Sequence, residues 1–256
     1  MPSVLTSRVG AVLTITLNRP EVYNAFNREL HAALHDALGE AAAEDIRAVV
    51  IIGAGKAFCA GQDLKELQEL SGSVRDVLEE SYHPNVGRIR ALEKPVIAAV
   101  NGVAAGAGLS LACACDLRLA SSSAVFVPGF AGIGLVPDAG GTWFLERLLG
   151  YARAFEWMGS NRRLTSVEAL EWGLVSAVLP EEGFAAGVAE LAAQWAAAPT
   201  RAVAFAKRLF EHAHDASLEQ QLALEAELQQ EAIQTADFRE GVAAFLEKRP
   251  PRFTGS

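Results

Sequence analysis

The continuous apolar run VIAAV at residues 96–100 is the feature that most constrains the fold of this chain. A strand without polar positions must be covered on both faces, as in the centre of a parallel sheet. The run is followed by a tight Asn101-Gly102 turn, by a helix predicted over residues 107–115 and by a strand predicted over residues 117–120. Strand, helix and strand in this order predict a right-handed parallel crossover.

The same order occurs nearer the N-terminus. Residues 9–17 alternate and are rich in β-branched types, which predicts a strand, and Asn27 is a suitable N-cap for the helix that follows. Residues 47–53 form a second continuous apolar run. Two such units predict an α/β fold, and the pattern alone favours a plain doubly wound sheet.

The rest of the chain is mainly helical in pattern. The polar stretch 73–94 is predicted to be helical, with an interruption at His83-Pro84. We therefore expect an α/β core over residues 1–190 and a helical C-terminal part over residues 191–256. The later elements that we predict are helices at 143–149, 152–159, 166–173 and from 183 onward, and a short strand at 174–178.

Composition excludes several classes of partner. The chain has 256 residues, of which 51% are hydrophobic, and its net charge is -9 at pH 7. Nucleic acids and anionic membranes attract proteins with a dense positive field, so we expect neither as a partner. No apolar run reaches the roughly 18 residues of a membrane span, and we expect a cytoplasmic protein. An odd number of cysteines predicts reduced, buried thiols at Cys59, Cys113 and Cys115.

Two glycine-flanked turns, at residues 56–64 and 102–108, follow predicted strands. The second turn opens a helix, whose first amides have no partner within the helix. Two such amides that converge on one oxygen form an oxyanion hole, and small residues let the main chain approach a ligand. The alternative reading is that the small residues only allow close packing of the helix.

Asp138 is the candidate general base. It lies in the sequence GLVPDAGG at residues 134–141, where its neighbours are apolar. Poor solvation raises the pKa of a carboxyl group and suits it to proton transfer. Asp63 and Asp116 are rival acids, but their places at turns favour a cap or loop anchor for Asp63 and a structural strand-start role for Asp116.

Other catalytic patterns are missing from the sequence. The glycine turn does not continue as Gly-x-Gly-x-x-Gly, because position 111 is Leu, and no phosphate loop or Gly-x-Ser-x-Gly elbow occurs. We expect no metal site, because no pattern brings the histidines together. His31 and His35 are one helical turn apart and are predicted to lie on the surface.

Together, the two turns and further short motifs resemble the enoyl-CoA hydratase/isomerase (crotonase) superfamily, in its order and spacing over almost the whole chain. The resemblance implies a crotonase-like fold of stacked ββα units with a helical C-terminal part, an acyl-CoA thioester substrate and no other cofactor. It also implies a homotrimer or a dimer of trimers assembled through the C-terminal helices. The motifs are Asn18-Arg19-Pro20, Asn24-Ala25, FCAGQD at 58–63, KPVIA at 94–98, Asn101-Gly102 to Gly108, Ala114-Cys115-Asp116 and Gly140-Gly141-Thr142.

The resemblance assigns roles to single residues. The oxyanion hole is expected at the main-chain amides of Gln62 and Ala107, with Gly108 as the next candidate. Hydratases of this superfamily carry two glutamates, and the matching positions here hold Ser110 and Phe130. Asp138 stands where some isomerases of the superfamily place their catalytic acid. The residues expected to contact substrate or coenzyme A are Arg19, Ala25, Ala60, Gln62, Asp63, Leu64, Gly108, Phe130 and Lys248.

An acyl-CoA isomerase with one carboxylate base is therefore the expected function. Residues 135–143 and 237–255 resemble the isomerases that convert 1,2-epoxyphenylacetyl-CoA to an oxepin thioester in phenylacetate degradation. A shift of a Δ3 double bond to Δ2 needs the same groups, so a general enoyl-CoA isomerase of fatty-acid β-oxidation is the first alternative. The second alternative is a catalytically silent acyl-CoA-binding protein, which the absence of both glutamates favours and Asp138 opposes.

Overall fold

The computed structural model describes residues 1–68 and 72–256 and has the expected α/β architecture. Its main sheet has six strands in the order β1-β2-β3-β5-β7-β10, and every neighbouring pair is parallel except β1 and β2. The bounds of these strands are Val4–Val9, Val12–Leu17, Ala48–Gly53, Val96–Val100, Leu117–Ser121 and Ala177–Leu179.

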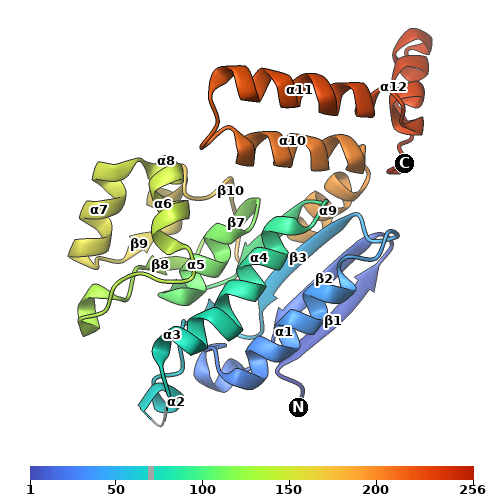
Figure 1. Ribbon diagram of the computed structural model, residues 1–256. Coiled ribbons are helices and arrows are strands. Elements are labelled where there is room, and N and C mark those ends of the chain that lie inside the picture. Colours follow the sequence, from blue (N-terminus) through green and yellow to red (C-terminus); the bar gives the residue numbers. More distant parts are fainter. Residues whose placement is uncertain (69–71) are drawn as a thin grey trace.

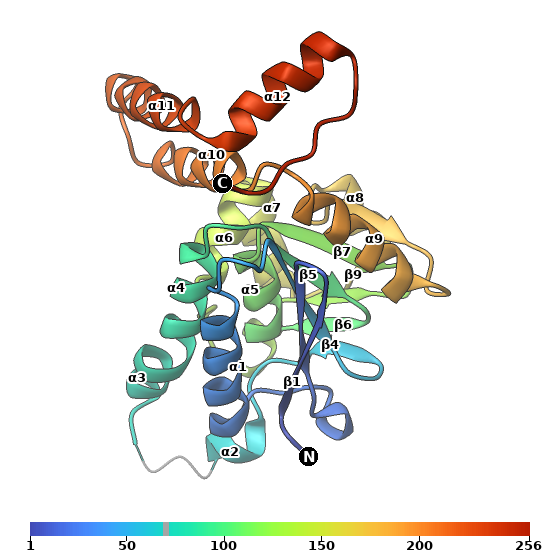
Figure 2. The same ribbon diagram turned by 90° about the vertical axis from the view of Figure 1, so that its right-hand side faces the viewer.

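Helices cover both faces of the main sheet, as the continuous apolar runs predict. Figures 1 and 2 show α1 (Arg28–Glu40), α4 (His83–Ala91) and α5 (Ala107–Ala114) on one side of the strands and α9 (Phe184–Ala196) on the other. Successive strand residues point to opposite faces. Val49, Ile51 and Ala98 accordingly belong to the core below α1 and α5, whereas Val50, Ile97 and Ala99 pack with the apolar face of α9.

A second, four-stranded sheet completes the ββα units. Its order is β4-β6-β8-β9, and the sequence pattern alone missed all four strands, so a plain doubly wound sheet is the wrong description. Each strand has only two or three residues, too few to show a period of two. Their bounds are Ala57–Cys59, Val103–Ala105, Val125–Val127 and Leu164–Thr165.

The strand predicted over residues 9–17 is confirmed for β2, at residues 12–17, but the prediction missed β1 and the turn between the two strands. β1 and β2 pair antiparallel around Gly10, which has φ +58°, a value that glycine adopts at little cost. β1 is exposed along most of its length because it is an edge strand, so it lacks the apolar run that identifies the central strands.

The first helical predictions have mixed outcomes. Asn27 caps α1, and its side chain accepts a hydrogen bond of 2.9 Å from the Leu30 amide, as predicted. The predicted interruption at His83-Pro84 is wrong, because the helical stretch continues through these two residues. Residues Val74–Val77 (α3), a π-helix at Leu78–Tyr82 and α4 follow without a break. A π-turn is a wider turn of helix, and it leads here into the first turn of α4, where proline is tolerated because the helix needs no N–H there.

The chain beyond residue 140 contains the expected helices. The division at residue 190 stays a prediction, and α9 crosses that position. Along the described residues, no helix has both the length and the apolar character needed to cross a membrane. The remaining helices are η1 (Pro20–Val22), α2 (Leu64–Gln68), η3 (Ala131–Ile133), α6 (Gly141–Leu149), α7 (Tyr151–Ser160), α8 (Ser166–Glu171), α10 (Thr200–His212), α11 (Leu218–Ala232) and α12 (Ala236–Glu247).

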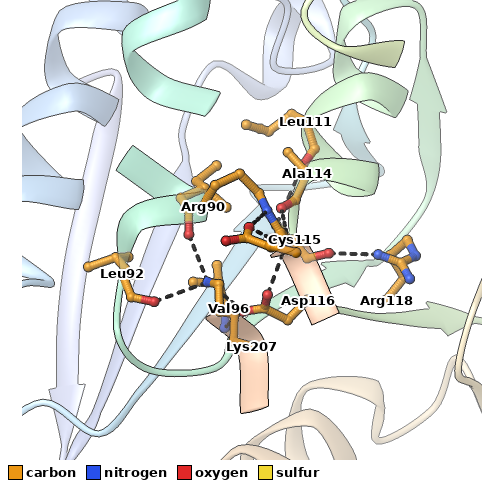
Figure 3. Close-up of polar contacts among 11 residues, drawn as sticks. Arg90, Leu92, Val96, Leu111, Ala114, Cys115, Asp116, Arg118 and Lys207 are labelled. Atoms are coloured by element: carbon orange, nitrogen blue, oxygen red, sulfur yellow. Dashed lines mark hydrogen bonds and ion pairs between the residues drawn. The ribbon is translucent and has the colours of Figure 1, made fainter. Parts of the chain in front are cut away.

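A polar network around Asp116 joins α10 to the core, and Figure 3 shows its members. The Asp116 carboxylate accepts hydrogen bonds from the Val96 amide at 2.8 Å, from Lys207 Nζ at 3.0 Å and from Arg90 Nη1 at 3.2 Å. Arg90 also pairs with Glu211 of α10 at 2.6 Å. Asp116 is therefore the strand-start residue that the sequence predicts, and it also anchors α10.

Replacement of Asp116 tests this anchor. Asp116→Ala leaves the Val96 amide without its acceptor and removes the carboxylate that pairs with the Lys207 ammonium, whose side chain is only 9% exposed. We expect the variant to lose about 3 kcal/mol of unfolding free energy, measured by urea denaturation. Lys207→Met is the matched control, with an expected loss of about 1 kcal/mol because Asp116 keeps Arg90. Equal losses in both variants would contradict the assigned role.

Candidate functional site

A mainly apolar cavity of about 210 Å³ lies where the two glycine-flanked turns meet the loop that carries Asp138. The turns come from β4 and β6, and α3 and the π-helix supply the opposite wall. The lining residues are Ala60, Gly61, Gln62, Leu64, Leu67, Val74, Val77, Leu78, Tyr82, Ala105, Gly106, Ala107, Gly129, Phe130, Ile133, Leu135 and Asp138.

The Gln62 amide is held free by the strand segment before α1. Phe26 donates from its amide to the Gly61 carbonyl at 2.7 Å and accepts at its own carbonyl from the Asp63 amide at 2.9 Å. These two bonds fix the chain on both sides of Gln62, as in a parallel bridge. The Gln62 amide points away from Phe26 as a result and donates to no group in the part of the chain that the structure describes.

The Ala107 amide is the second donor that bonds to none of the described residues. Ala107 is the first residue of α5, and within that helix the hydrogen bonding begins with the Ser110 amide, which donates to the Gly106 carbonyl at 3.1 Å. A Cβ added at Gly61 would lie 3.3 Å from the Ala107 nitrogen, so the two turns are in contact. Both Gln62 and Ala107 line the cavity. The pair can therefore bind one oxygen, with the positive end of α5 behind it.

Gly108 has a packing role in this chain. A Cβ at this position would lie 2.3 Å from the Cys59 carbonyl oxygen, so any side chain there would push α5 away from β4. Gly108 does not line the cavity, whereas Ala107 does. The geometry therefore favours the Ala107 amide over the Gly108 amide as the second donor to a bound oxygen.

The Asp138 side chain lines the cavity. Its Oδ1 is buried and hydrogen-bonds to none of the described residues. Burial raises the pKa of Asp138 to about 6, against the opposing charge of His83. The loop is fixed through the main chain, because the Asp138 carbonyl accepts from Ser110 Oγ at 3.0 Å and from the Gly141 amide at 2.8 Å.

Asp63 is the opposite case. Its carboxylate accepts from Arg19 Nη2 at 3.0 Å and from the Lys65 amide at 3.2 Å, at the start of α2. Burial acts to raise the pKa of Asp63, but the hydrogen bonds and charge of Arg19 and the Lys65 amide hold it below its usual range. Asp63 is thus the loop anchor that the sequence predicts. Arg19 also donates to the Ala25 carbonyl at 2.6 Å.

The structure brings some of the predicted site residues together and separates others. Ala60, Leu64 and Phe130 line the cavity, and Phe130 is buried. Arg19, Ala25 and Asp63 form the hydrogen-bonded group beside it. Lys248 is exposed at the C-terminal end of α12, which lies at the end of the molecule opposite α2 in Figures 1 and 2.

Sequence reasoning missed Tyr82. The side chain is buried, it lines the cavity, and its hydroxyl donates to Gln62 Oε1 at 2.6 Å. Burial is the main cause that raises the pKa of Tyr82, so the phenol is neutral. No local motif identifies Tyr82, because the contact with Gln62 spans 20 residues.

The prediction that His31 lies on the surface is wrong. It is buried on the inner face of α1 and stacks on Phe26 with a centroid distance of 4.6 Å. Burial lowers the pKa of His31 to about 4, so the imidazole is neutral at pH 7. The position follows Leu30 and lies three residues before Leu34, and therefore falls within the apolar stripe of the helix.

No cysteine is among the described residues that line the cavity. The cysteines are free and buried, as predicted: Cys59, Cys113 and Cys115. Within residues 1–68 and 72–256, no group of three or more His, Cys, Asp or Glu side chains is placed to hold a metal ion.

Comparison with known proteins identifies the family. Residues 7–256 match the enoyl-CoA hydratase/isomerase family. The chain is 44% identical to the 1,2-epoxyphenylacetyl-CoA isomerase of Escherichia coli, over 100% of this chain and 99% of that one. It is 48% identical to a "probable enoyl-CoA hydratase" of Rhodobacter capsulatus, over 94% and 93%. The crystal structure of an enoyl-CoA hydratase from Polaromonas sp. superposes with a TM-score of 0.92 at 39% identity, covering 98% and 99%. The chain belongs to the enoyl-CoA hydratase/isomerase family, as the motifs indicate, and has the crotonase fold.

The raised pKa of Asp138 predicts how the stability of the protein changes with pH. Because the pKa of Asp138 is raised to about 6 in the folded protein, the folded state binds more protons than the unfolded state between about pH 4 and pH 6. The wild type should therefore lose stability as the pH rises through this window. Asp138→Asn has no such loss, and we expect it to be about 1–2 kcal/mol more stable than the wild type at pH 8, after allowance for partial solvent screening.

Urea denaturation of both proteins at pH 4 and pH 8 measures this difference. The gain should shrink toward zero at pH 4, where Asp138 is protonated in the folded state. A variant that is less stable than the wild type at pH 8 would show that Asp138 has a stabilising partner.

Proposed function

We propose that this protein is an isomerase of acyl-CoA thioesters that works with a single carboxylate, Asp138, and an oxyanion hole made of the Gln62 and Ala107 amides. One observation carries the proposal: Asp138, whose buried Oδ1 has no hydrogen-bond partner among the described residues, lines the same cavity as two main-chain amides that donate to none of those residues. Membership of the enoyl-CoA hydratase/isomerase family supports a CoA thioester as the substrate.

The reaction follows from the acidity of a thioester. Removal of a proton from C2 places negative charge on the thioester oxygen as an enolate. The Gln62 and Ala107 amides donate to that oxygen, and loss of one such donor costs about 3–4 kcal/mol in enzymes where this has been measured. Asp138 takes the proton from C2 and returns it at C4. The double bond moves from Δ3 to Δ2, and the carboxylate is regenerated without a second acid or base.

Hydration is a poor match for this cavity. Addition of water to a double bond needs groups that hold a water molecule, remove its proton and deliver a proton to C2. Ser110 uses its hydroxyl to hold the Asp138 carbonyl, and Phe130 contributes a buried phenyl ring. Asp138 is the only acidic side chain among the described residues that line the cavity. These substitutions favour isomerisation.

The acyl group that we propose first is the 1,2-epoxyphenylacetyl group, converted to its oxepin isomer. The E. coli relative that bears this name supports the choice, and so does a mainly apolar cavity of about 210 Å³ with two aromatic walls, Tyr82 and Phe130. The second candidate is a general Δ3 to Δ2 enoyl-CoA isomerase of fatty-acid breakdown, which the same base and amides can serve. A silent acyl-CoA-binding protein is the third, and the unpaired Asp138 opposes it.

The assembly and the coenzyme site are part of the proposal. We propose a homotrimer or a dimer of trimers, in which Lys248 contacts the coenzyme phosphates across a subunit contact, while Arg19 and Leu64 border the same site. Large apolar side chains exposed on α10, α11 and α12 in the single chain support subunit contacts there. They are Phe210, Leu218, Leu222, Phe238, Val242, Phe245 and Leu246. We propose a cytoplasmic location, with no further cofactor.

Proton exchange at C2 tests the role of Asp138. We expect the wild type, incubated with a 3-enoyl-CoA in heavy water, to form the 2-enoyl product and to exchange C2 hydrogen of the remaining substrate for deuterium, through return to C2 of a proton that Asp138 has exchanged with solvent. Asp138→Asn should lose both activities by about 10² to 10⁴-fold, because the amide cannot accept the proton. Mass spectrometry and absorbance follow the two events. Near-normal turnover by Asp138→Asn would remove Asp138 from the mechanism.

The same assay separates the candidate functions. Rapid turnover of straight-chain 3-enoyl-CoA without conversion of the aromatic epoxide favours the general isomerase. Tight thioester binding with neither exchange nor turnover favours the silent binding protein.

The pH dependence of turnover follows from the raised pKa. A base must be ionised, so kcat/KM should be constant at high pH and should fall tenfold per unit as the pH drops below about 6. An ordinary exposed aspartate would place this limb near pH 4. A limb near pH 4 would therefore show that Asp138 is either well solvated or not the base.

A further inference from the structure

The segment at residues 129–135 forms the outer wall of the cavity. Its members Gly129, Phe130, Ile133 and Leu135 line the cavity. Phe130 is buried, whereas Ile133 and Leu135 are 56% and 49% exposed, so the segment has the cavity on one side and solvent on the other. The Ile133 and Leu135 amides donate to the Phe130 carbonyl at 3.1 Å and 3.0 Å, which gives the segment a defined internal shape.

One hydrogen bond joins this segment to the rest of the described chain. The Gly129 amide donates to Asn161 Oδ1 at 2.7 Å. Among the described residues, no other hydrogen bond connects residues 129–135 with residues outside the segment. The position of this wall relative to the cavity therefore depends on the bond to Asn161 and on side-chain packing.

Asn161 is itself firmly attached to the core. It ends α7 in the left-handed region, with φ 52°, which asparagine adopts more readily than most residues. Its amide donates to the Trp157 carbonyl at 3.1 Å, and the carbonyl of the next residue, Arg162, accepts from Trp157 Nε1 at 2.9 Å. Trp157 is fully buried, so these two bonds hold the main chain on both sides of the Asn161 carbonyl.

The Asn161 side chain fits closely against the segment. The Gly129 amide is a donor, so the atom of Asn161 that faces it must be the oxygen, Oδ1. The other end, Nδ2, donates to none of the described residues and lies against Gly132, where an added Cβ would be 2.5 Å from it. Gly132 does not have a positive φ. Glycine at this position therefore serves the close approach of Asn161.

Gly129 also connects the segment to the glycine turn before α5. A Cβ added at Gly129 would lie 3.2 Å from the Gly106 nitrogen, and the Gly106 amide donates to the Val127 carbonyl at 3.1 Å. Gly106 directly precedes Ala107, whose amide is one of the two proposed donors to the thioester oxygen. The bond to Asn161 thus acts where the outer wall meets the turn that carries this donor.

We propose that Asn161 is a positioning residue that holds the 129–135 segment at the cavity and so gives the site its preference for a compact, rigid acyl group. The inference rests on the proposed binding of an acyl-CoA thioester in this cavity. It does not depend on proton transfer by Asp138. A planar ring needs a wall of fixed shape because it cannot change its own shape, whereas a flexible chain can follow a wall that has moved.

The test compares two variants of Asn161. Asn161→Gly removes the side-chain acceptor but keeps the end of α7, because glycine adopts a φ of 52° at little cost. Asn161→Asp is the matched control, since it keeps an acceptor oxygen and tolerates the left-handed conformation. The probes are phenylacetyl-CoA, which carries a rigid ring, and hexanoyl-CoA, which carries a flexible chain. Calorimetry gives the Kd of each thioester.

We expect Asn161→Gly to bind phenylacetyl-CoA about fivefold more weakly than the wild type, because binding must then order a wall that has lost one hydrogen bond. The affinity for hexanoyl-CoA should change by less than about twofold, since the chain adapts to the altered wall. Asn161→Asp should bind both thioesters as the wild type does. Amide hydrogen exchange of Gly129, measured by NMR, should be faster in Asn161→Gly and unchanged in Asn161→Asp.

A second variant acts from the other side of the contact. Gly132→Ala places a Cβ against the Asn161 side chain and should displace it, with the same change in the ratio of the two Kd values. In the Asn161→Gly background, Gly132→Ala should have little further effect, because the side chain that it displaces is absent.

Three results would overturn the proposal. They are an unchanged ratio of the two Kd values in Asn161→Gly, additive effects of Asn161→Gly and Gly132→Ala, and the absence of thioester binding by the wild type. Saturated thioesters bind without double-bond transfer, so the failure of the proposed reaction is seen separately. Full turnover by Asp138→Asn would remove Asp138 from the mechanism, and the ratio of Kd values would still decide the role of Asn161.

Discussion

The site depends on one close contact between backbones, where α5 meets β4. Gly108 lies so near the Cys59 carbonyl that a single added carbon would overlap with it at 2.3 Å. This contact sets the depth of α5 and brings the Ala107 amide beside the turn at Gly61. Phe26 holds the other side of that turn through two main-chain hydrogen bonds. Two free amides therefore face one cavity because glycine stands at the contact and because a neighbouring strand uses the remaining hydrogen-bonding groups.

The second constraint is the solvation of Asp138. Its carbonyl is held by Ser110 and Gly141, whereas its carboxylate Oδ1 has no hydrogen-bond partner among the described residues. Ala139, which follows it, has φ +49°, a conformation that non-glycine residues adopt at some cost in free energy. The loop thus fixes the main chain firmly and leaves the acid poorly solvated. Asp63 shows the contrast, because an arginine and an amide keep its carboxylate ionised and occupied.

Much of this could be predicted from the sequence. The apolar runs at β3 and β5 predict strands covered on both faces, Asn27 predicts the start of α1, and Asp138 stands out by its apolar neighbours. The short strands of the second sheet could not be predicted from periodicity, because two or three residues carry no pattern. Tyr82 and His31 were missed or misplaced because their environments are set by contacts between α1, the π-helix and the glycine turns, which are distant in sequence.

A crystal structure of Asp138→Asn with a 3-enoyl-CoA bound tests the central claim most directly. The account predicts that the thioester oxygen accepts from both the Gln62 and Ala107 amides at about 2.9 Å, with C2 facing residue 138 at about 3.5 Å. A thioester oxygen that lies away from either amide, or an acyl group whose C2 points away from residue 138, would contradict it.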